Sequence, residues 1–170
     1  MALLGQEPAA AMHHEHAAAQ PSVTLSVSAG ERQTVLSLAD LQALPQLTVT
    51  VQNAHSKREE SYTGPLVTDV LAKAGVGLSP ATEHDVLRSY VAASGTDGYF
   101  VVFSGAELQG ALHRGQCIVA IAQSGQPLAG NGAFQLIDSL DVKPARWVRN
   151  LSGLAVVPVT AVSAIPQPRR

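Results

Sequence analysis

Hydrophobic and polar residues alternate with a period of two along several short stretches of this chain. Such alternation is typical of strands with one buried face, and the apolar run QCIVAIAQ is also rich in residues that favour strands. The Asp97-Gly98 pair predicts a tight turn, so the strands on either side of it should form a hairpin. Strands are predicted at residues 23–27, 33–38, 47–51, 87–93, 99–103, 116–123, 134–137 and 154–159.

Only short helices are predicted between these strands. Ser37 can cap a helix over residues 38–44, which Pro45 ends. Apolar residues in 66–76 recur at helical spacing up to a stop at Gly75, and Ser104 can cap one further turn. Many short strands with few short helices predict an α+β domain, a compact mixed β-sheet with short helices.

The domain is predicted to cover residues 22–159 of the 170-residue chain. Residues 1–21 are rich in alanine and histidine without an apolar period, so they are predicted to be a flexible, disordered leader. The cluster His13-His14-Glu15-His16 in it has side chains that bind copper, nickel or zinc, but metal binding by such a leader would be adventitious. The Pro-rich segment 160–170 is predicted to be a loose tail.

Composition excludes several classes of function. Charged residues make up 14% of the chain and the net charge is -2, so no basic field exists that would recruit nucleic acid. No apolar run is long enough to insert into a membrane. The single cysteine, Cys117, excludes an internal disulfide and a thiolate zinc site, and its apolar strand predicts a buried, inert thiol.

Two segments carry candidate binding chemistry. His55 is followed by two cations and by Glu59-Glu60; this is either a ligand-binding loop or the solvated tip of a hairpin. In ARWVR, alternation predicts Arg146 on one face, with the only tryptophan, Trp147, and Arg149 on the other. Trp147 can stack on a flat ring and the arginines can bind an anion; the alternative is a core tryptophan between surface arginines.

Several segments together resemble the oxidoreductase molybdopterin-binding domain family, which has the sulfite-oxidase fold. They are YTGPLVTDVLAKAGV, SGTDGYFVVFSGAEL, IAQSGQPLAGNGAFQLI and VKPARWVRNLSGLAV, in the family's order and spacing. The resemblance covers roughly residues 23–159. It implies a sulfite-oxidase-type fold with a pterin-binding groove.

The chain also departs from this family. Relatives with molybdenum have a cysteine thiolate before the Tyr-Thr-Gly segment, where this chain has Gln52 and Asn53, and a neutral amide is a poor substitute for a soft sulfur. Gln135 stands where relatives commonly carry an arginine. The chain therefore resembles short stand-alone members that lack the molybdenum-ligating cysteine, in which a pterin or molybdopterin-like ligand is expected without molybdenum.

The resemblance implies a pterin-like small-ligand binding protein, a carrier or sensor. Ligand-binding residues are expected among His55, Tyr62, Arg146, Trp147, Arg149 and Tyr99. Of these, Tyr99 is predicted mainly to pack under its turn. Glu107 is expected to cap a helix or pair with an arginine. The alternatives are a molybdopterin-dependent oxidoreductase with a non-cysteine ligand, or an interaction module without a ligand. An exported, periplasmic location with a membrane receptor or signalling partner is expected.

Overall fold

The computed structural model describes residues 20–77, 86–128 and 130–159. Its helices are α1 (Leu38–Gln42) and α2 (Val67–Lys73), with single 3-10 turns η2 (Gly105–Leu108) and η3 (Pro144–Arg146). Its strands are β1 (Leu25–Ala29), β2 (Arg32–Leu36), β3 (Leu47–Asn53), β4 (Arg58–Gly64), β5 (Ser89–Gly95), β6 (Phe100–Ser104), β7 (Cys117–Ala120), β8 (Ala122–Gln123), β9 (Gln126–Pro127), β10 (Gln135–Asp138) and β11 (Leu151–Pro158).

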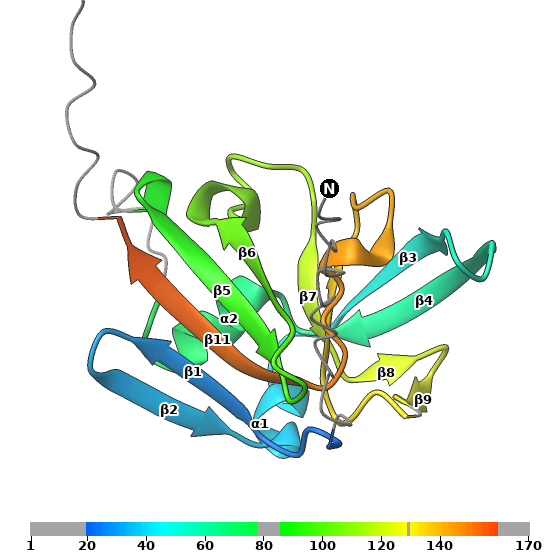
Figure 1. Ribbon diagram of the computed structural model, residues 1–170, viewed down its shortest axis with the longest axis horizontal. Helices are drawn as coiled ribbons and strands as arrows, with labels where there is room; N and C mark the ends of the chain where they lie inside the picture. Colours follow the sequence, from blue (N-terminus) through cyan, green and yellow to red (C-terminus); the bar gives the residue numbers. More distant parts are fainter. Residues whose placement is uncertain (1–19, 78–85, 129, 160–170) are drawn as a thin grey trace, which may run out of the picture.

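The largest sheet has five strands in the order β2-β1-β11-β5-β6 (Figure 1). β1 runs parallel to β11, which joins the first and last strands of the domain, and the other neighbours are antiparallel. α2 lies behind the sheet in Figure 1, and buried residues of the sheet strands form one core with the buried residues of α2. The core on this side includes Leu25, Val27, Val70, Leu71, Val91, Phe103 and Leu154.

A second part of the fold contains the sheet β3-β4-β8-β9 and the pair β7–β10. Every residue of β7 is buried, and successive residues contribute to two cores. Cys117 and Val119 belong to the core of the five-stranded sheet, while Ile118 and Ala120 pack with Tyr62 and other residues of the second core. A strand buried on both faces explains why CIVA is apolar throughout instead of alternating.

The mixed sheets and short helices confirm the α+β class, and most predicted strands are present with ends shifted by a few residues. Both predicted caps are confirmed as capping boxes. Ser37 accepts from the backbone N–H of Asp40, whose carboxylate accepts from the N–H of Ser37, and Ser104 and Glu107 repeat this exchange. Gly98, with φ +80, follows Asp97 in the predicted turn between β5 and β6.

Three local predictions were wrong. Residues 58–64, taken as a charged loop and a turn, form strand β4, which pairs with the whole of β3. Gly64 is needed for close approach, because a Cβ there would lie 1.9 Å from the backbone oxygen of Val119. The predicted strand 116–123 is divided into β7 and β8 at Ile121, and ARWVR is a 3-10 turn followed by irregular chain instead of an alternating strand.

Other predictions lie outside the described residues. The leader is described only at Gln20 and Pro21, and neither the histidine cluster nor the tail 160–170 is described. No described helix has the length and apolar character to cross a membrane.

Candidate functional site

Four separate segments meet around a cavity of about 420 Å³. The β3–β4 turn, the β5–β6 turn, the start of β10 and η3 with the residues after it each contribute to the lining. This volume lies within the range of small-molecule sites in proteins. The cavity is lined by His55, Tyr99, Gln135, Pro144, Ala145, Trp147 and Arg149.

Trp147 forms the back of the cavity and is only 6% exposed. Its ring meets that of Tyr62 edge-to-face, with centroids 5.9 Å apart and an interplanar angle of 70°. The indole Nε1–H is buried without a hydrogen-bond partner among the described residues, and such groups are uncommon in folded proteins. Trp147 therefore has little free face for stacking, but it has an unused donor.

Gln135 is a lining residue that sequence reasoning did not include among the candidates. It is 2% exposed, and its side-chain oxygen accepts a hydrogen bond of 3.2 Å from Asn131 Nδ2. The amide therefore has its NH₂ group, which donates to no other described residue, available to a ligand. The only signal in the sequence was its place in the family pattern, where relatives carry another donor, arginine.

Glu60 on β4 lies behind this wall at the centre of a hydrogen-bond network. Its carboxylate accepts from Asn53 Nδ2 at 3.0 Å, from the Ser56 hydroxyl at 2.9 Å and from the Tyr62 hydroxyl at 2.8 Å. Burial opposes ionisation, but these hydrogen bonds and the charge of Arg149 outweigh it and lower the pKa of Glu60. Burial and the negative charge of Glu60 raise the pKa of Tyr62.

Asn53, near the expected position of the family's thiolate, closes the β3–β4 turn. Its side-chain oxygen accepts from the backbone N–H of His55 at 2.9 Å and of Ser56 at 3.3 Å, while its NH₂ group binds Glu60. The turn ends at Lys57, whose backbone has φ 55°, a value that is uncommon for residues other than glycine. Asn53 is thus a structural residue that fixes the loop carrying His55.

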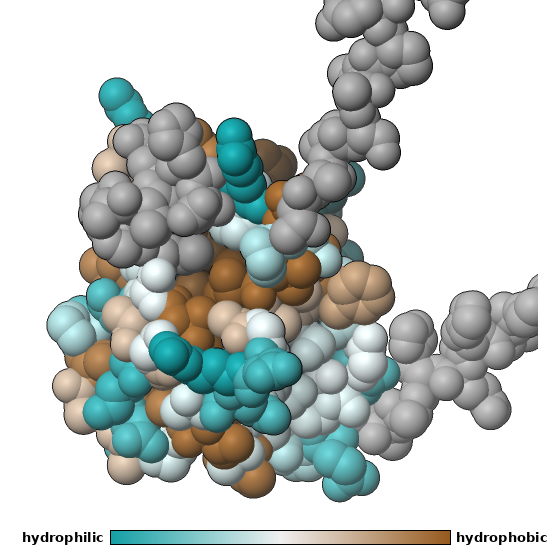
Figure 2. Space-filling model, turned by 90° about the vertical axis from the view of Figure 1, so that its left-hand side faces the viewer, coloured by the Kyte–Doolittle hydropathy of each residue, from teal (hydrophilic) through white to brown (hydrophobic). Residues whose placement is uncertain are grey.

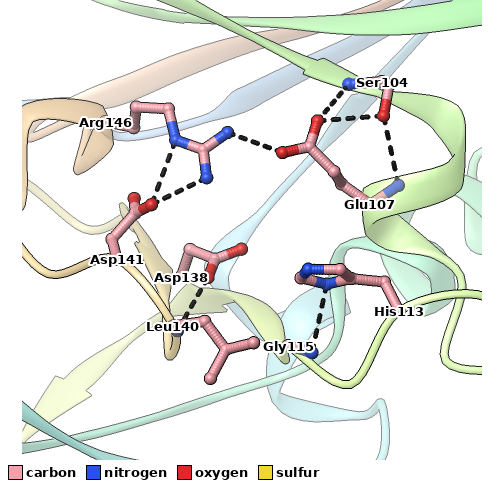
Figure 3. A network of polar contacts seen from close by, with 8 residues as sticks. All are labelled: Ser104, Glu107, His113, Gly115, Asp138, Leu140, Asp141 and Arg146. Carbon is pink, nitrogen blue, oxygen red and sulfur yellow. Dashed lines mark hydrogen bonds and ion pairs between the residues drawn. The ribbon is translucent and has the colours of Figure 1, made fainter.

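Arg146 lies away from the cavity lining, in a separate polar network (Figure 3). Its Nη2 and Nε donate to Asp141 Oδ1 at 2.7 and 3.1 Å, and its Nη1 donates to Glu107 Oε1 at 2.9 Å. The guanidinium also lies 4.3 Å from the centre of the Phe103 ring. Burial opposes ionisation of Glu107, but hydrogen bonds from Ser104 and Arg146 outweigh it and lower its pKa.

The predicted site residues therefore separate into three groups. His55, Tyr99, Trp147 and Arg149 line the cavity, Tyr62 supports Trp147 from behind, and Arg146 lies in the separate network. The predicted separation of Arg146 from Trp147 and Arg149 is present although the segment is not a strand. Tyr99 donates its hydroxyl hydrogen to the backbone oxygen of Ala145, so it holds the two sides of the rim together. Ligand binding by any of these residues stays a prediction.

Comparison with known proteins shows similarity at the level of the fold. No protein-family model matches the chain, and no curated protein sequence matches it. Among solved structures, it is similar to the sulfane dehydrogenase SoxCD from Paracoccus pantotrophus, with a TM-score of 0.57 and 16% sequence identity. The match covers 78% of this chain and 37% of that chain. The likeness supports a distant relation to the fold that the sequence motifs resemble.

The described residues offer no thiolate at the cavity for a molybdenum centre. Among the described ranges, no three His, Cys, Asp or Glu side chains are grouped so as to hold a metal ion. The thiol of Cys117 is buried in β7, where burial and then the charge of Asp138 raise its pKa, so it is not disposed to act as a thiolate. The donors around the cavity suit an organic ligand instead. The expected absence of molybdenum stays a prediction.

Proposed function

We propose that this protein binds a small, anionic heterocycle of the pterin class in the cavity, as a carrier or sensor. The observation that carries the proposal is the cavity of about 420 Å³ itself, whose lining includes Arg149 and the Gln135 amide. The Nε1–H of Trp147 is buried without a partner among the described residues, and a ligand acceptor that reached it would satisfy a group that is otherwise costly to leave unpaired. The fold's distant likeness to an oxidoreductase is consistent with this class of ligand but does not identify it.

The other lining groups favour the same chemistry. The NH₂ group of Gln135 and the guanidinium of Arg149 are donors, and no Asp or Glu side chain of the described residues lines the cavity. A donor-rich wall selects a ligand with several acceptors and a negative charge, as on a pterin ring with an acidic substituent. Pro144 and Tyr99 supply apolar surface on the rim.

An open cavity also bears on the alternative of a module without any ligand. Such a module would be expected to fill the groove with its own side chains, whereas about 420 Å³ is left between these segments. The volume therefore supports ligand binding over that alternative.

The test is calorimetric titration of the purified full chain with 6-carboxypterin, a pterin with an anionic substituent. Saturable binding is expected, and Arg149→Met should weaken it about tenfold or more, because a charge-assisted hydrogen bond contributes roughly 1.5–3 kcal/mol. Arg88→Met is the matched control, since Arg88 is exposed and outside the cavity lining, and it should leave affinity unchanged.

Two results would count against the proposal. Absence of saturable binding would refute it for this ligand class, and equal affinity of the wild type and Arg149→Met would remove the cavity as the site. Elemental analysis of protein from a molybdate-supplied host gives a separate check. Molybdenum at one atom per chain would favour the oxidoreductase alternative instead.

A further inference from the structure

The outer face of the five-stranded sheet is the face opposite α2, and no helix or strand of the described residues lies over it (Figure 1). Strand register orders its side chains into three rows across the sheet. The first row is Val35, Ser26, Gly153, Ser94 and Phe100, the second is Gln33, Ser28, Ala155, Ala92 and Val102, and the third is Val157, Tyr90 and Ser104.

None of the residues in these rows is charged, although the sheet face is open to solvent. Figure 2 shows this face obliquely at its right side, where the surface is pale, neither strongly hydrophilic nor strongly hydrophobic. Solvent-exposed sheet faces ordinarily carry charged and polar side chains, whereas depletion of charge marks the centre of protein interfaces. The face therefore lacks charged side chains, whose desolvation would oppose association.

The face has both a hollow and a projecting side chain. Small side chains of β1, β5 and β11 leave a hollow of about 330 Å³ in its middle. Gly153 lies at the floor, where a Cβ would come within 2.6 Å of the Ser94 hydroxyl. Beside the hollow, on the edge strand β6, stand Phe100 at 66% exposure and Val102 at 46%. The face thus carries both a hollow and a projecting aromatic ring.

We propose that this face binds a second copy of the chain about a twofold axis, with Phe100 of each copy seated in the hollow of the other. A twofold interface uses the same patch on both copies, so it requires the projection and the hollow on one face, as found here. Two sheets packed face to face in this way resemble a β-sandwich.

The arrangement limits the contact to a small area. Phe100 lies on β6 and the hollow centres on β11, so seating one in the other places the twofold axis over β5, and β11, β5 and β6 of the two copies overlap over roughly 14 by 20 Å. Two copies would remove roughly 600 Å² from solvent, which is the size of a weak, transient contact. Dimers are therefore expected only at high protein concentration. Phe100 directly follows Tyr99, so association would also steady the rim of the cavity.

The experiment is sedimentation equilibrium of the full chain over a wide concentration range. The wild type is expected to form dimers, and Phe100→Glu and Ser28→Arg should each weaken association at least tenfold, because a charge would be buried at the interface without a partner. Val142→Glu is the matched control: Val142 is 86% exposed and lies elsewhere, so it should not alter association.

Mixing the two variants makes the test specific for the proposed arrangement. In a heterodimer, Glu at position 100 of one chain faces Arg at position 28 of the other, and the second contact keeps its native residues. The mixture should therefore form dimers when neither variant alone does. A monomeric wild type would overturn the proposal, as would dimers that resist Phe100→Glu. A monomer that dimerises only after removal of residues 1–19 would also overturn it, since the chain's own leader would then cover the face.

Discussion

Arg146 and Arg149 lie three residues apart but differ in their surroundings: Arg146 forms ion pairs within the fold, and Arg149 lines the cavity. Arg146→Ala tests this difference most directly. Arg146 is the only cation in a network with Asp141 and Glu107 among the described residues. Its removal leaves two carboxylates without their partner and exposes the face of Phe103. We expect a large loss of stability and no direct effect on the cavity.

The magnitude follows from the exposure of each partner. Arg146 and Glu107 each have 34% of the side chain exposed, so this pair contributes about 0.2–1 kcal/mol. The side chain of Asp141 is only 12% exposed, and its hydrogen bonds from a charged donor contribute roughly 1.5–3 kcal/mol. The contact with Phe103 adds about 0.5–1 kcal/mol. Because one side chain makes all three contacts, we expect a total of about 3 kcal/mol.

The assay is unfolding of the wild type, Arg146→Ala and Arg146→Lys by urea and by heat, each monitored by circular dichroism. A loss of about 3 kcal/mol corresponds to a Tm lower by about 10 °C. Arg146→Lys should lie between the two, because lysine keeps the charge but cannot donate in parallel to Asp141. Arg149→Met is the control and should stay within about 0.5 kcal/mol of the wild type. A loss below about 1 kcal/mol for Arg146→Ala would show that the network is not structural.

Two further substitutions test local geometry. Gly64→Ala should destabilise the fold by several kcal/mol in urea unfolding, because the new Cβ would meet the backbone oxygen of Val119 at 1.9 Å, whereas Gly110→Ala, with open space around it, should not. Glu60→Gln tests the lowered pKa of Glu60. The wild type should lose stability as pH falls from the ordinary pKa of glutamate, about 4.3, to the lower pKa in the folded protein. The variant has no carboxylate at this position, so it should lose less stability between these two values. If the wild type and Glu60→Gln lose the same amount of stability at acid pH, the network around Glu60 does not favour the carboxylate.

Local rules predicted the elements that local residues determine. The capping boxes at Ser37 and Ser104 and the turn at Asp97-Gly98 each depend on residues within three positions, and all are present. Strand β4 was missed because its first residues are charged. Those residues lie on an exposed part of a hairpin, where pairing with β3 is what makes the strand, and pairing partners are not visible in the pattern of β4 alone.

The site was harder to predict because its determinants are distant in sequence. Glu107 lies 39 residues from Arg146, and this contact helps to withdraw Arg146 from the cavity. Gln135 enters the cavity because β10 pairs with β7, with Gln135 opposite Ala120, a relation that nothing near Gln135 in the sequence indicates. Residue type thus indicated the chemistry of the segment 146–149, while tertiary packing decided which side chain reaches the cavity.

Asn53 is one of the two residues near the position at which the sequence resemblance places a thiolate, and it makes contacts that a thiolate could not make. A thiolate at this position could accept hydrogen bonds from the backbone of His55 and Ser56, but it could not donate to Glu60. The asparagine amide does both, because it carries an acceptor and two donors. It is thus matched to an ionised Glu60 and to a rigid β3–β4 turn, and it holds His55 at the cavity. In this chain the position fixes the β3–β4 turn and thereby the place of His55 in the cavity lining, which is consistent with the proposed binding of an organic anion.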